Sequence, residues 1–385
     1  MIKVCLLGAS GSIGKQTLEV MKKNPSDFEL VGFSVGRRTQ KIHHVLHVFP
    51  NVRYICIAKK NKLSYYQKAY PRISFYYGDK GLLDLINESK PDMVVNALVG
   101  FVGLKPTLYA LEKNLDVCLA NKEALVVGGE LVNSLLREGK GRLYPIDSEH
   151  SALKKCLMVD DQSIDKLMLT ASGGAFRSLK REELNNVKAS DALKHPTWKM
   201  GPKITIDCAT MVNKSFEIIE AHYLFNFPYS QIGIKLHDES YVHSYILYKN
   251  GSMRLDVGKP DMRVPIKHAL YKYNLPFKTV ATDDLNKIKK CHFHDFDMMR
   301  YPIVEWAKTV INEKGTYGAV FNAANEVAVH AYLRDEISFL DIERIINKLM
   351  KEHKNILHPS YEQLADVDLA TRMSVYKMIK KGEIA

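Results

Sequence analysis

The sequence of 385 residues has few cysteines and no long apolar run. Its six cysteines are scattered and include no C-x-x-C pair, so the sequence indicates neither a disulfide framework nor a zinc ribbon. We therefore expect reduced thiols in a cytoplasmic protein. No apolar segment approaches the ~20 residues that a membrane-spanning helix needs, and the first residues are typical of a short strand rather than a signal sequence. We expect a globular chain without a membrane partner.

Acidic residues are fewer than basic ones, since 43 Asp and Glu stand against 55 Lys and Arg, for a formal net charge of +12. Such a charge favours anionic partners, including nucleic acid, phosphorylated metabolites and phosphate-bearing cofactors. The lysines are spread along the chain, however, and lysines that decorate solvated helices explain the charge equally well. The charge alone does not identify a partner.

Residues 1–146 alternate short apolar segments with amphipathic ones, which predicts an α/β fold with a Rossmann-like, doubly wound parallel sheet. The expected strands are Ile2–Leu7, Phe28–Ser34, Tyr54–Ile57, Met93–Ala97, Val117–Ala120 and Arg142–Pro145. Polar clusters follow the last two strands at residues 121–123 and 147–149. Because ligands bind beyond the carboxyl ends of parallel strands, we expect a functional edge there.

The remaining chain divides into three parts. Residues 147–274 predict an α+β catalytic domain with strands at Lys166–Thr170, Lys203–Asp207, Ile232–Leu236 and Val242–Tyr248. Residues 275–299 have no clear periodicity and read as a linker. Residues 300–385 predict a helical domain, because apolar residues from Ile342 to Leu349 recur at i, i+3, i+4 and i+7 and Leu364–Lys381 ends at Gly382.

A glycine-rich turn, Gly8-Ala9-Ser10-Gly11-Ser12-Ile13-Gly14, joins the first strand to an amphipathic segment. Glycines allow a tight turn close to a pyrophosphate, and the helix N-terminus stabilises its negative charge. The spacing is G-x-x-G-x-x-G rather than G-x-G-x-x-G, so a purely structural turn stays open as an alternative.

Gly36-Arg37-Arg38 ends the second strand, where an NAD-preferring site presents an acidic residue. The planar guanidinium groups suit the 2′-phosphate of NADPH. NADPH is therefore the expected cofactor, and a solvated arginine pair at a helix start is the alternative.

Three acidic residues are candidate metal ligands. Asp147 and Glu149 follow a predicted strand, and an extended i, i+2 spacing places both carboxylates on one side. Glu217 shares related faces of a predicted helix with Asn213 and Lys214. Three converging carboxylates suit Mg²⁺ or Mn²⁺, but spacing alone favours ordinary surface acids.

Seven segments together resemble the 1-deoxy-D-xylulose-5-phosphate reductoisomerase family from about Lys3 to about Lys380. They are Gly8–Gly14, Leu119–Glu123, Pro145–His150, Ser172–Gly174, His195–Gly201, Ala209–Lys214 and Asn322–Glu326. The Asp-Ser-Glu-His and Met-Val-Asn-Lys segments are the most specific.

The resemblance implies an NADPH- and divalent-metal-dependent enzyme of the non-mevalonate isoprenoid precursor pathway. It would isomerise and reduce 1-deoxy-D-xylulose 5-phosphate to 2-C-methyl-D-erythritol 4-phosphate. A sugar phosphate would be its small-molecule substrate, a homodimer its assembly, and nucleic acid no partner.

The resemblance also implies a role for each matching residue. The metal ligands would be Asp147, Glu149 and Glu217. The substrate would contact Lys122, Ser148, Glu149, Ser172, His195, Cys208, Asn213, Lys214 and Glu217. The cofactor would contact Gly8, Ser10, Gly11, Ser12, Ile13, Gly36, Arg37, Arg38, Asn121, Glu123, Met200 and Gly201. Lys122, Glu149, His195 and Trp198 would be catalytic, with Trp198 closing a mobile flap over the substrate.

Two positions depart from the family pattern. Cys208 stands where relatives commonly have Ser, and a thiol is the weaker hydrogen-bond donor. His237-Asp238-Glu239-Ser240 replaces His-Pro-Gln-Ser, which puts contacts near His243 in doubt. Cys291-His292-Phe293-His294 lacks a second ligand pair and is not read as a zinc site.

Two other functions stay open. A Rossmann-type dehydrogenase would transfer hydride without isomerisation and would need no metal. An NADPH-sensing regulatory module would bind cofactor without turnover, and it would leave the three acidic residues unexplained. NADPH oxidation with and without a chelator distinguishes them.

Overall fold

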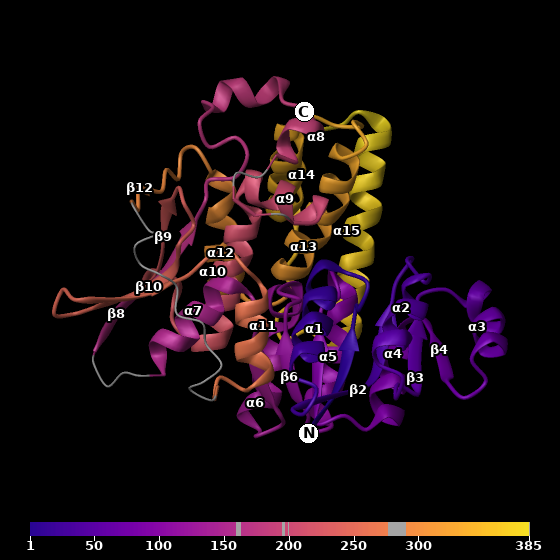
Figure 1. Ribbon diagram of the computed structural model, residues 1–385. Helices are drawn as coiled ribbons and strands as arrows, with labels where there is room; N and C mark the ends of the chain where they lie inside the picture. Colours follow the sequence, from indigo (N-terminus) through magenta and orange to yellow (C-terminus); the bar gives the residue numbers. More distant parts are fainter. Residues whose placement is uncertain (159–162, 195–196, 199, 276–289, 385) are drawn as a thin grey trace. The chain divides into compact units, whose positions relative to one another are not determined.

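The computed structural model describes residues 1–158, 163–194, 197–198, 200–275 and 290–384 (Figure 1). The chain forms two compact units. Unit 1 comprises residues 1–121, 131–147 and 261–279, and unit 2 comprises residues 122–130, 148–260 and 280–385. Among the described residues, no helix combines the length and the apolar character that crossing a bilayer requires.

Unit 1 contains a seven-stranded parallel sheet in the order β4-β3-β2-β1-β5-β6-β7. The strands are β1 (Ile2–Leu7), β2 (Phe28–Val35), β3 (Tyr54–Ile57), β4 (Ser74–Tyr77), β5 (Met93–Asn96), β6 (Asp116–Leu119) and β7 (Arg142–Pro145). The order reverses at β1, which makes the sheet doubly wound and confirms the predicted fold class. The sequence analysis missed β4.

Helices connect these strands, as parallel pairing requires. They are α1 (Ser12–Lys23), α2 (Lys41–Val48), α3 (Leu63–Ala69), α4 (Gly78–Ser89) and α5 (Leu104–Glu112), followed by α6 (Glu123–Arg137), which has a break at Gly128 and continues from unit 2 into unit 1. Later in the chain, α11 (Arg263–Leu270) packs beside α1 in unit 1. Ile266 and Leu270 join the core of that unit, although residues up to 274 were expected in the second domain.

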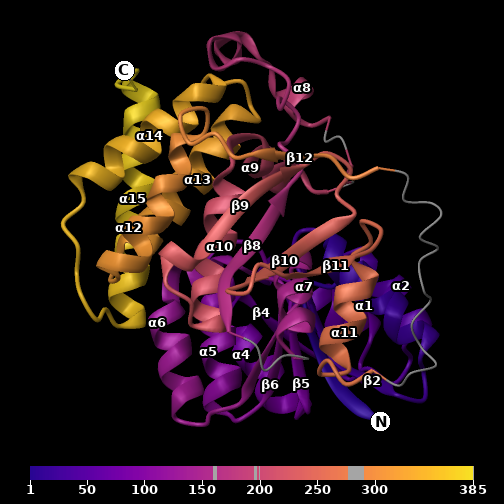
Figure 2. The same ribbon diagram turned by 90° about the vertical axis from the view of Figure 1, so that its left-hand side faces the viewer.

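Unit 2 contains a mixed sheet in the order β11-β10-β8-β9-β12, in which β8 and β9 are parallel and the other pairs antiparallel (Figure 2). Its strands are β8 (Ile164–Ala171), β9 (Ile232–His237), β10 (Val242–Tyr248), β11 (Met253–Val257) and β12 (Phe293–Asp295). β12 lies within the range expected as a linker.

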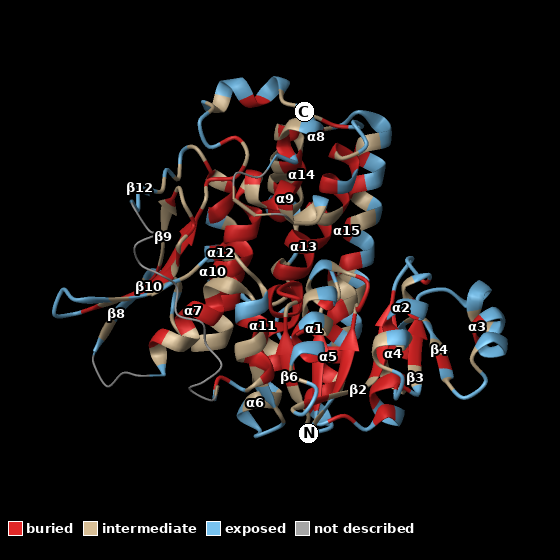
Figure 3. Cartoon of the chain, viewed as in Figure 1, coloured by how far each residue is buried: buried red, intermediate tan, exposed pale blue. Residues whose placement is uncertain are grey.

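The helices of unit 2 are α7 (Ser148–Leu157), α8 (Ala189–Ala192), α9 (Pro202–Thr210), α10 (Val212–Phe225), α12 (Glu305–Glu313), α13 (Tyr317–Tyr332), α14 (Phe339–Glu352) and α15 (Tyr361–Lys381). The last four confirm the predicted helical C-terminal region. α10 and α13 are buried along most of their length and pack in one core (Figure 3). A rigid, buried α10 is important because it carries Asn213, Lys214 and Glu217.

Two local predictions in unit 2 were wrong. The segment Lys203–Asp207, expected as a strand, belongs to helix α9. Pro202 suits the first helical turn, and Thr205 closes that turn with its backbone N–H and its hydroxyl on the Gly201 carbonyl at 3.1 and 2.9 Å. Ser148 begins helix α7, so Asp147 and Glu149 are not related by an extended i, i+2 spacing.

Candidate functional site

The glycine-rich turn of unit 1 depends on its glycines. Gly8 has φ of +88°, and a Cβ there would lie 2.5 Å from the Ala97 carbonyl oxygen. A Cβ on Gly14 would lie 2.2 Å from the Gly8 carbonyl oxygen. The turn connects β1 to the N-terminus of α1 beside the point where the strand order reverses. This is the position and the close backbone geometry of a dinucleotide site.

The neighbouring strand supplies positive charge to unit 1. Gly36, Arg37 and Arg38 are exposed directly after β2, and β2 pairs with β1. At the same edge, the Asn121 amide is buried and donates to the carbonyls of Leu98 and Gly100 at 3.2 and 3.0 Å. Two exposed guanidinium groups beyond one strand of a doubly wound sheet suit a phosphate-bearing nucleotide.

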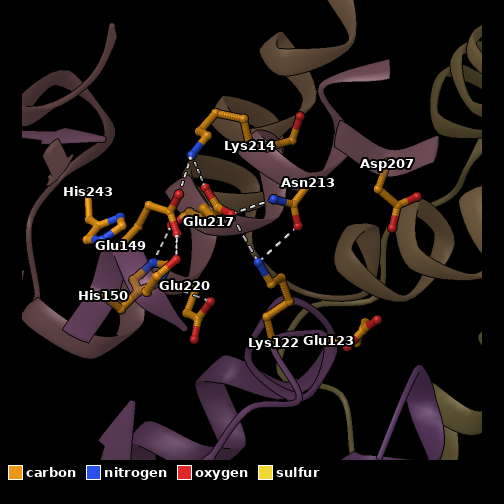
Figure 4. Close-up of polar contacts among 12 residues, drawn as sticks. Lys122, Glu123, Glu149, His150, Asp207, Asn213, Lys214, Glu217, Glu220 and His243 are labelled. Carbon is orange, nitrogen blue, oxygen red and sulfur yellow. Dashed lines mark hydrogen bonds and ion pairs between the residues drawn. The ribbon is translucent and has the colours of Figure 1, made fainter. Parts of the chain in front are cut away.

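A buried polar cluster lies in unit 2, where α10 meets the first residues of α6 (Figure 4). The Lys122 ammonium donates to Asn213 Oδ1 at 2.9 Å and to Glu217 Oε1 at 3.1 Å. Asn213 also donates to Glu217 Oε1 at 2.5 Å, as expected for residues four apart on one helix. The Lys122 and Glu217 side chains are only 8% and 2% exposed, so these groups interact in a medium that screens charge poorly.

Lys214 connects this cluster to α7. Its ammonium forms ion pairs with Glu217 Oε2 and, at 3.5 Å, with Glu149 Oε1. It also donates to the Thr170 carbonyl at 2.5 Å, at the end of β8. The two ammonium groups of Lys122 and Lys214 therefore pair with the two carboxylates of Glu149 and Glu217.

The carboxylates of Glu149 and Glu217 offer ligand atoms within 4.8 Å of each other. Asp147 is bonded directly to Ser148, the first residue of α7, so chain connectivity keeps it two residues from Glu149. Ser148 donates its hydroxyl proton to Glu149 Oε2 at 2.5 Å. The hard oxygen donors of this segment suit a small divalent cation.

His150 and Glu220 hold α7 against α10 from within the core, and sequence reasoning missed this pair. His150 Nε2 donates to the Glu217 carbonyl at 2.8 Å, and His150 Nδ1 lies 3.3 Å from Glu220 Oε2. Both residues are fully buried. The sequence did contain a signal for this pair, because Glu220 is one turn beyond Glu217 on the same helix and His150 follows Glu149.

The flap segment is only partly described. His195 and Lys199 lie outside the described residues, so the role expected for His195 has no structural account. The Thr197 and Ser240 hydroxyl oxygens lie 3.2 Å apart, and the Trp198 ring centroid lies 6.0 Å from that of His243. Met200 and Gly201 lead directly into α9. The described flap residues therefore contact the turn that carries the family departure at 237–240.

Gly174 brings the segment after β8 against the backbone of α9. Gly174, with φ of +70°, packs so closely on α9 that a Cβ would lie 2.7 Å from the Cys208 carbonyl oxygen. Its N–H donates to Ser172 Oγ at 3.3 Å. Burial raises the pKa of the Cys208 thiol. The thiol is therefore neutral near pH 7, which makes it a weak donor rather than a nucleophile.

The second departure from the family pattern, at residues 237–240, contacts the segment Cys291–His294, which was considered above as a zinc motif. The Glu239 carboxylate accepts from His292 Nδ1 at 2.5 Å, and Asp238 lies 3.2 Å from His294 Nε2. These contacts accompany the pairing of β9 with β12. In this arrangement the two histidines bind carboxylates of the neighbouring turn.

Family models cover most of the chain. Residues 4–129 match 1-deoxy-D-xylulose 5-phosphate reductoisomerase, residues 143–225 match the C-terminal domain described under the same name, and residues 257–374 match the DXP reductoisomerase C-terminal domain.

Curated relatives match over nearly their whole length. The chain is 43% identical over 381 residues to 1-deoxy-D-xylulose 5-phosphate reductoisomerase 2 of Bacillus thuringiensis subsp. konkukian, covering 98% of this chain and 100% of the relative. It is 41% identical to the reductoisomerase of Halalkalibacterium halodurans, covering 98% and 99%.

Solved structures agree with this result. The reductoisomerase of Zymomonas mobilis in complex with NADPH has a TM-score of 0.89 at 32% identity, covering 98% of this chain and 99% of that one. A DOX-P reductoisomerase in complex with NADPH, fosmidomycin and magnesium has a TM-score of 0.91 at 31% identity, covering 99% and 98%.

Proposed function

Because the chain belongs to the 1-deoxy-D-xylulose 5-phosphate reductoisomerase family, we propose that it converts this sugar phosphate to 2-C-methyl-D-erythritol 4-phosphate. NADPH and a divalent cation, Mg²⁺ or Mn²⁺, are its cofactors. The observation that carries the proposal is the buried cluster of Lys122, Asn213, Lys214 and Glu217 beside Glu149. A plain dehydrogenase has no need of such a cluster.

We assign the metal to Asp147, Glu149 and Glu217. The fit rests on donor chemistry, because Glu149 and Glu217 bring carboxylate oxygens within 4.8 Å of each other and Asp147 is two residues from Glu149. When bound, the cation polarises the substrate carbonyl and stabilises enolate-like charge during the rearrangement. His150 supports the site by holding the backbone of Glu217.

The substrate is held by the side chains around the metal ligands. Lys122 and Ser148 donate to the substrate's carbonyl and hydroxyl oxygens, and Lys122 or a water molecule moves the proton. Ser172, Cys208, Asn213 and Lys214 bind the phosphate, together with His195. Phosphate binding far from the reacting carbons supplies energy for flap closure, and Trp198 then excludes water from the site.

The cofactor is assigned to unit 1 and to residues that flank the substrate site in sequence. The turn at Gly8, Ser10, Gly11, Ser12 and Ile13 receives the pyrophosphate, and Gly36, Arg37 and Arg38 receive the 2′-phosphate. Asn121, Glu123, Met200 and Gly201 complete the contacts. On this basis we propose residues 1–146 as the NADPH domain, 147–274 as the catalytic domain, 275–299 as a linker and 300–385 as the helical domain, with the difference that α11 packs in unit 1 and β12 belongs to the sheet of unit 2.

A second copy of the chain is the partner that suits one face of the sheet in unit 2. On β11, Met253, Leu255 and Val257 alternate along one face and are 56%, 42% and 36% exposed. Leu255 pairs with Tyr245 of β10, which pairs with Met168 of β8, so an apolar row crosses three strands. The opposite face packs into the main core. Tyr245 and Met168 are each only 8% exposed, so the exposed apolar surface of this row lies on β11, and an exposed apolar strand of this kind indicates a protein interface.

Leu255→Lys tests the homodimer by sedimentation. We expect the variant to sediment as a monomer, while Met299→Lys, which changes an exposed apolar residue away from β11, keeps the wild-type mass. A wild-type monomer at micromolar concentration contradicts the proposal. We assign the protein to the cytoplasm, consistent with its six free cysteines.

Oxidation of NADPH by the purified chain with 1-deoxy-D-xylulose 5-phosphate tests the function itself. We expect turnover with Mg²⁺, loss of turnover after complete removal of metal, and recovery on its return. Turnover without metal would indicate the plain dehydrogenase. NADPH binding without turnover would indicate the sensing module.

A further inference from the structure

Lys203, in the first turn of α9, carries an ammonium group that has no place in the roles assigned above. Its Nζ lies 3.1 Å from Glu123 Oε1 and 2.8 Å from Asp207 Oδ2. The three side chains are 13%, 8% and 3% exposed, so this is an internal ion-pair network. The ammonium also lies 5.4 Å from the ring centroid of Phe216, the residue before Glu217.

The network continues into α13. Asn325 donates to the second oxygen of Asp207 at 2.9 Å, and both residues are buried. Lys203 thus connects the first residue of α6 with α9, lies against α10, and reaches α13 through Asp207. All these residues belong to unit 2.

A buried ion-pair network of this kind contributes little to the stability of a core. One ammonium faces two carboxylates, and burial is the largest influence on Asp207, whose pKa it raises despite the ion pair with Lys203. Apolar residues of similar volume often stabilise a protein as well as buried ion pairs do. The arrangement therefore calls for a role beyond stability.

The positions of α6, α9 and α10 indicate what that role is. Glu123 follows Lys122, whose ammonium reaches Asn213 and Glu217. α9 begins directly after the flap residues Met200 and Gly201 and ends at Thr210, and Met211 leads from it into α10. Lys203 therefore acts on the residue beside Lys122 and on the helix between the flap and the phosphate-binding residues.

We propose that Lys203 is a positioning residue, which fixes the Glu123 carboxylate and the start of α6 so that Lys122 meets Asn213 and Glu217. The proposal rests on the proposed function, because Lys122 and Glu123 are assigned there to substrate and cofactor. Lys203 itself contacts neither.

Substitution of Lys203 tests the proposal. We expect Lys203→Met to lower kcat with 1-deoxy-D-xylulose 5-phosphate by about 10–100-fold and to raise the Kd of NADPH by about tenfold, as for the loss of a supporting contact behind a ligand. Lys203→Arg keeps the charge and should recover most of both. The matched control is Lys155→Met, which removes the ion pair with Asp256 at 2.6 Å elsewhere in unit 2 and should keep the wild-type kcat.

A double variant separates positioning from folding. Lys203→Met with Asp207→Asn keeps the net charge of the network and leaves Glu123, which is assigned to the cofactor, unchanged, so it should unfold at a urea concentration closer to that of the wild type than Lys203→Met alone. We expect its kcat to stay low. Wild-type kcat and NADPH affinity in folded Lys203→Met, or in the double variant, would overturn the proposal. Inactivity of the wild-type chain would instead reject the proposed function.

Discussion

Glu217→Gln is the most direct test of the buried cluster. The substitution keeps the shape of the side chain but removes the charge that Lys122 and Lys214 share. The cluster of Lys122, Lys214, Glu149 and residue 217 then changes from no net charge to plus one. The new amide group also places a donor against one of the two ammonium groups, where the wild type has an acceptor.

The geometry gives the size of the effect. Unit charges separated by the 3.1 Å between Lys122 Nζ and Glu217 Oε1 interact by about 5 kcal/mol at an effective dielectric constant of about 20. Loss of one partner of a buried pair costs about 3–5 kcal/mol. Glutamine at position 217 can still form some of the hydrogen bonds of the glutamate. We therefore expect the variant to lose about 3 kcal/mol of unfolding free energy, the lower end of this range. Loss of a supporting contact costs about 10–100-fold in metal affinity, so loss of a ligand should cost at least about 100-fold.

The assay measures NADPH oxidation as a function of Mg²⁺ concentration, with urea unfolding as a check on the fold. Asp368→Asn is the control, because it removes a buried carboxylate of α15 that pairs with Arg372 at 2.6 Å outside the cluster. We expect the control to lose stability and to keep its Mg²⁺ midpoint within about threefold, since an ordinary buried pair affects folding rather than this ligand set. A folded Glu217→Gln variant with the wild-type midpoint would refute the assignment of Glu217.

Three further outcomes follow from the structure. Gly8→Ala should abolish measurable NADPH binding in fluorescence titrations, because its Cβ would lie 2.5 Å from a carbonyl oxygen at φ of +88°; retained binding would contradict the turn. Cys291 is exposed whereas Cys208 is half-buried, and because burial raises the pKa of both thiols, access of the reagent decides the order: iodoacetamide at neutral pH should modify Cys291 first in peptide mapping. Burial lowers the pKa of His222 below 6.5, so the unfolded chain binds a proton that the folded chain does not, and stability should fall as pH drops below that value. His222→Gln should reduce this slope in urea unfolding at several pH values, and an unchanged slope would contradict the reasoning.

Local patterns predicted the parallel sheet and the glycine turn because both depend on short segments. The β1 strand and the turn after it are continuous in sequence, and Asn213 and Glu217 are joined by helical spacing. The error at Lys203–Asp207 has a local cause as well. Ile204 and Ile206 alternate with polar residues, which imitates a strand, whereas packing of α9 against α10 and α13 decides for a helix.

Contacts between distant segments could not be predicted from spacing. Lys122 and Glu217 are 95 residues apart, and only resemblance to a family suggested that both belong to one site. The same limit explains why the link between Lys203 and Glu123 was missed, since its partners are separated by 80 residues and one of them was placed in a strand.

The junction between α9 and α10 restricts how the sequence of this site can evolve. Met211 alone separates the two helices, and it has a left-handed backbone with φ of +67°. β-branched residues are strongly disfavoured in that conformation, whereas Gly and Asn adopt it readily. Inserting or deleting one residue at this elbow would rotate α10 by about 100° and turn Asn213 and Glu217 away from Lys122. Natural variants of this enzyme should therefore keep the length of this joint even where its side chain differs.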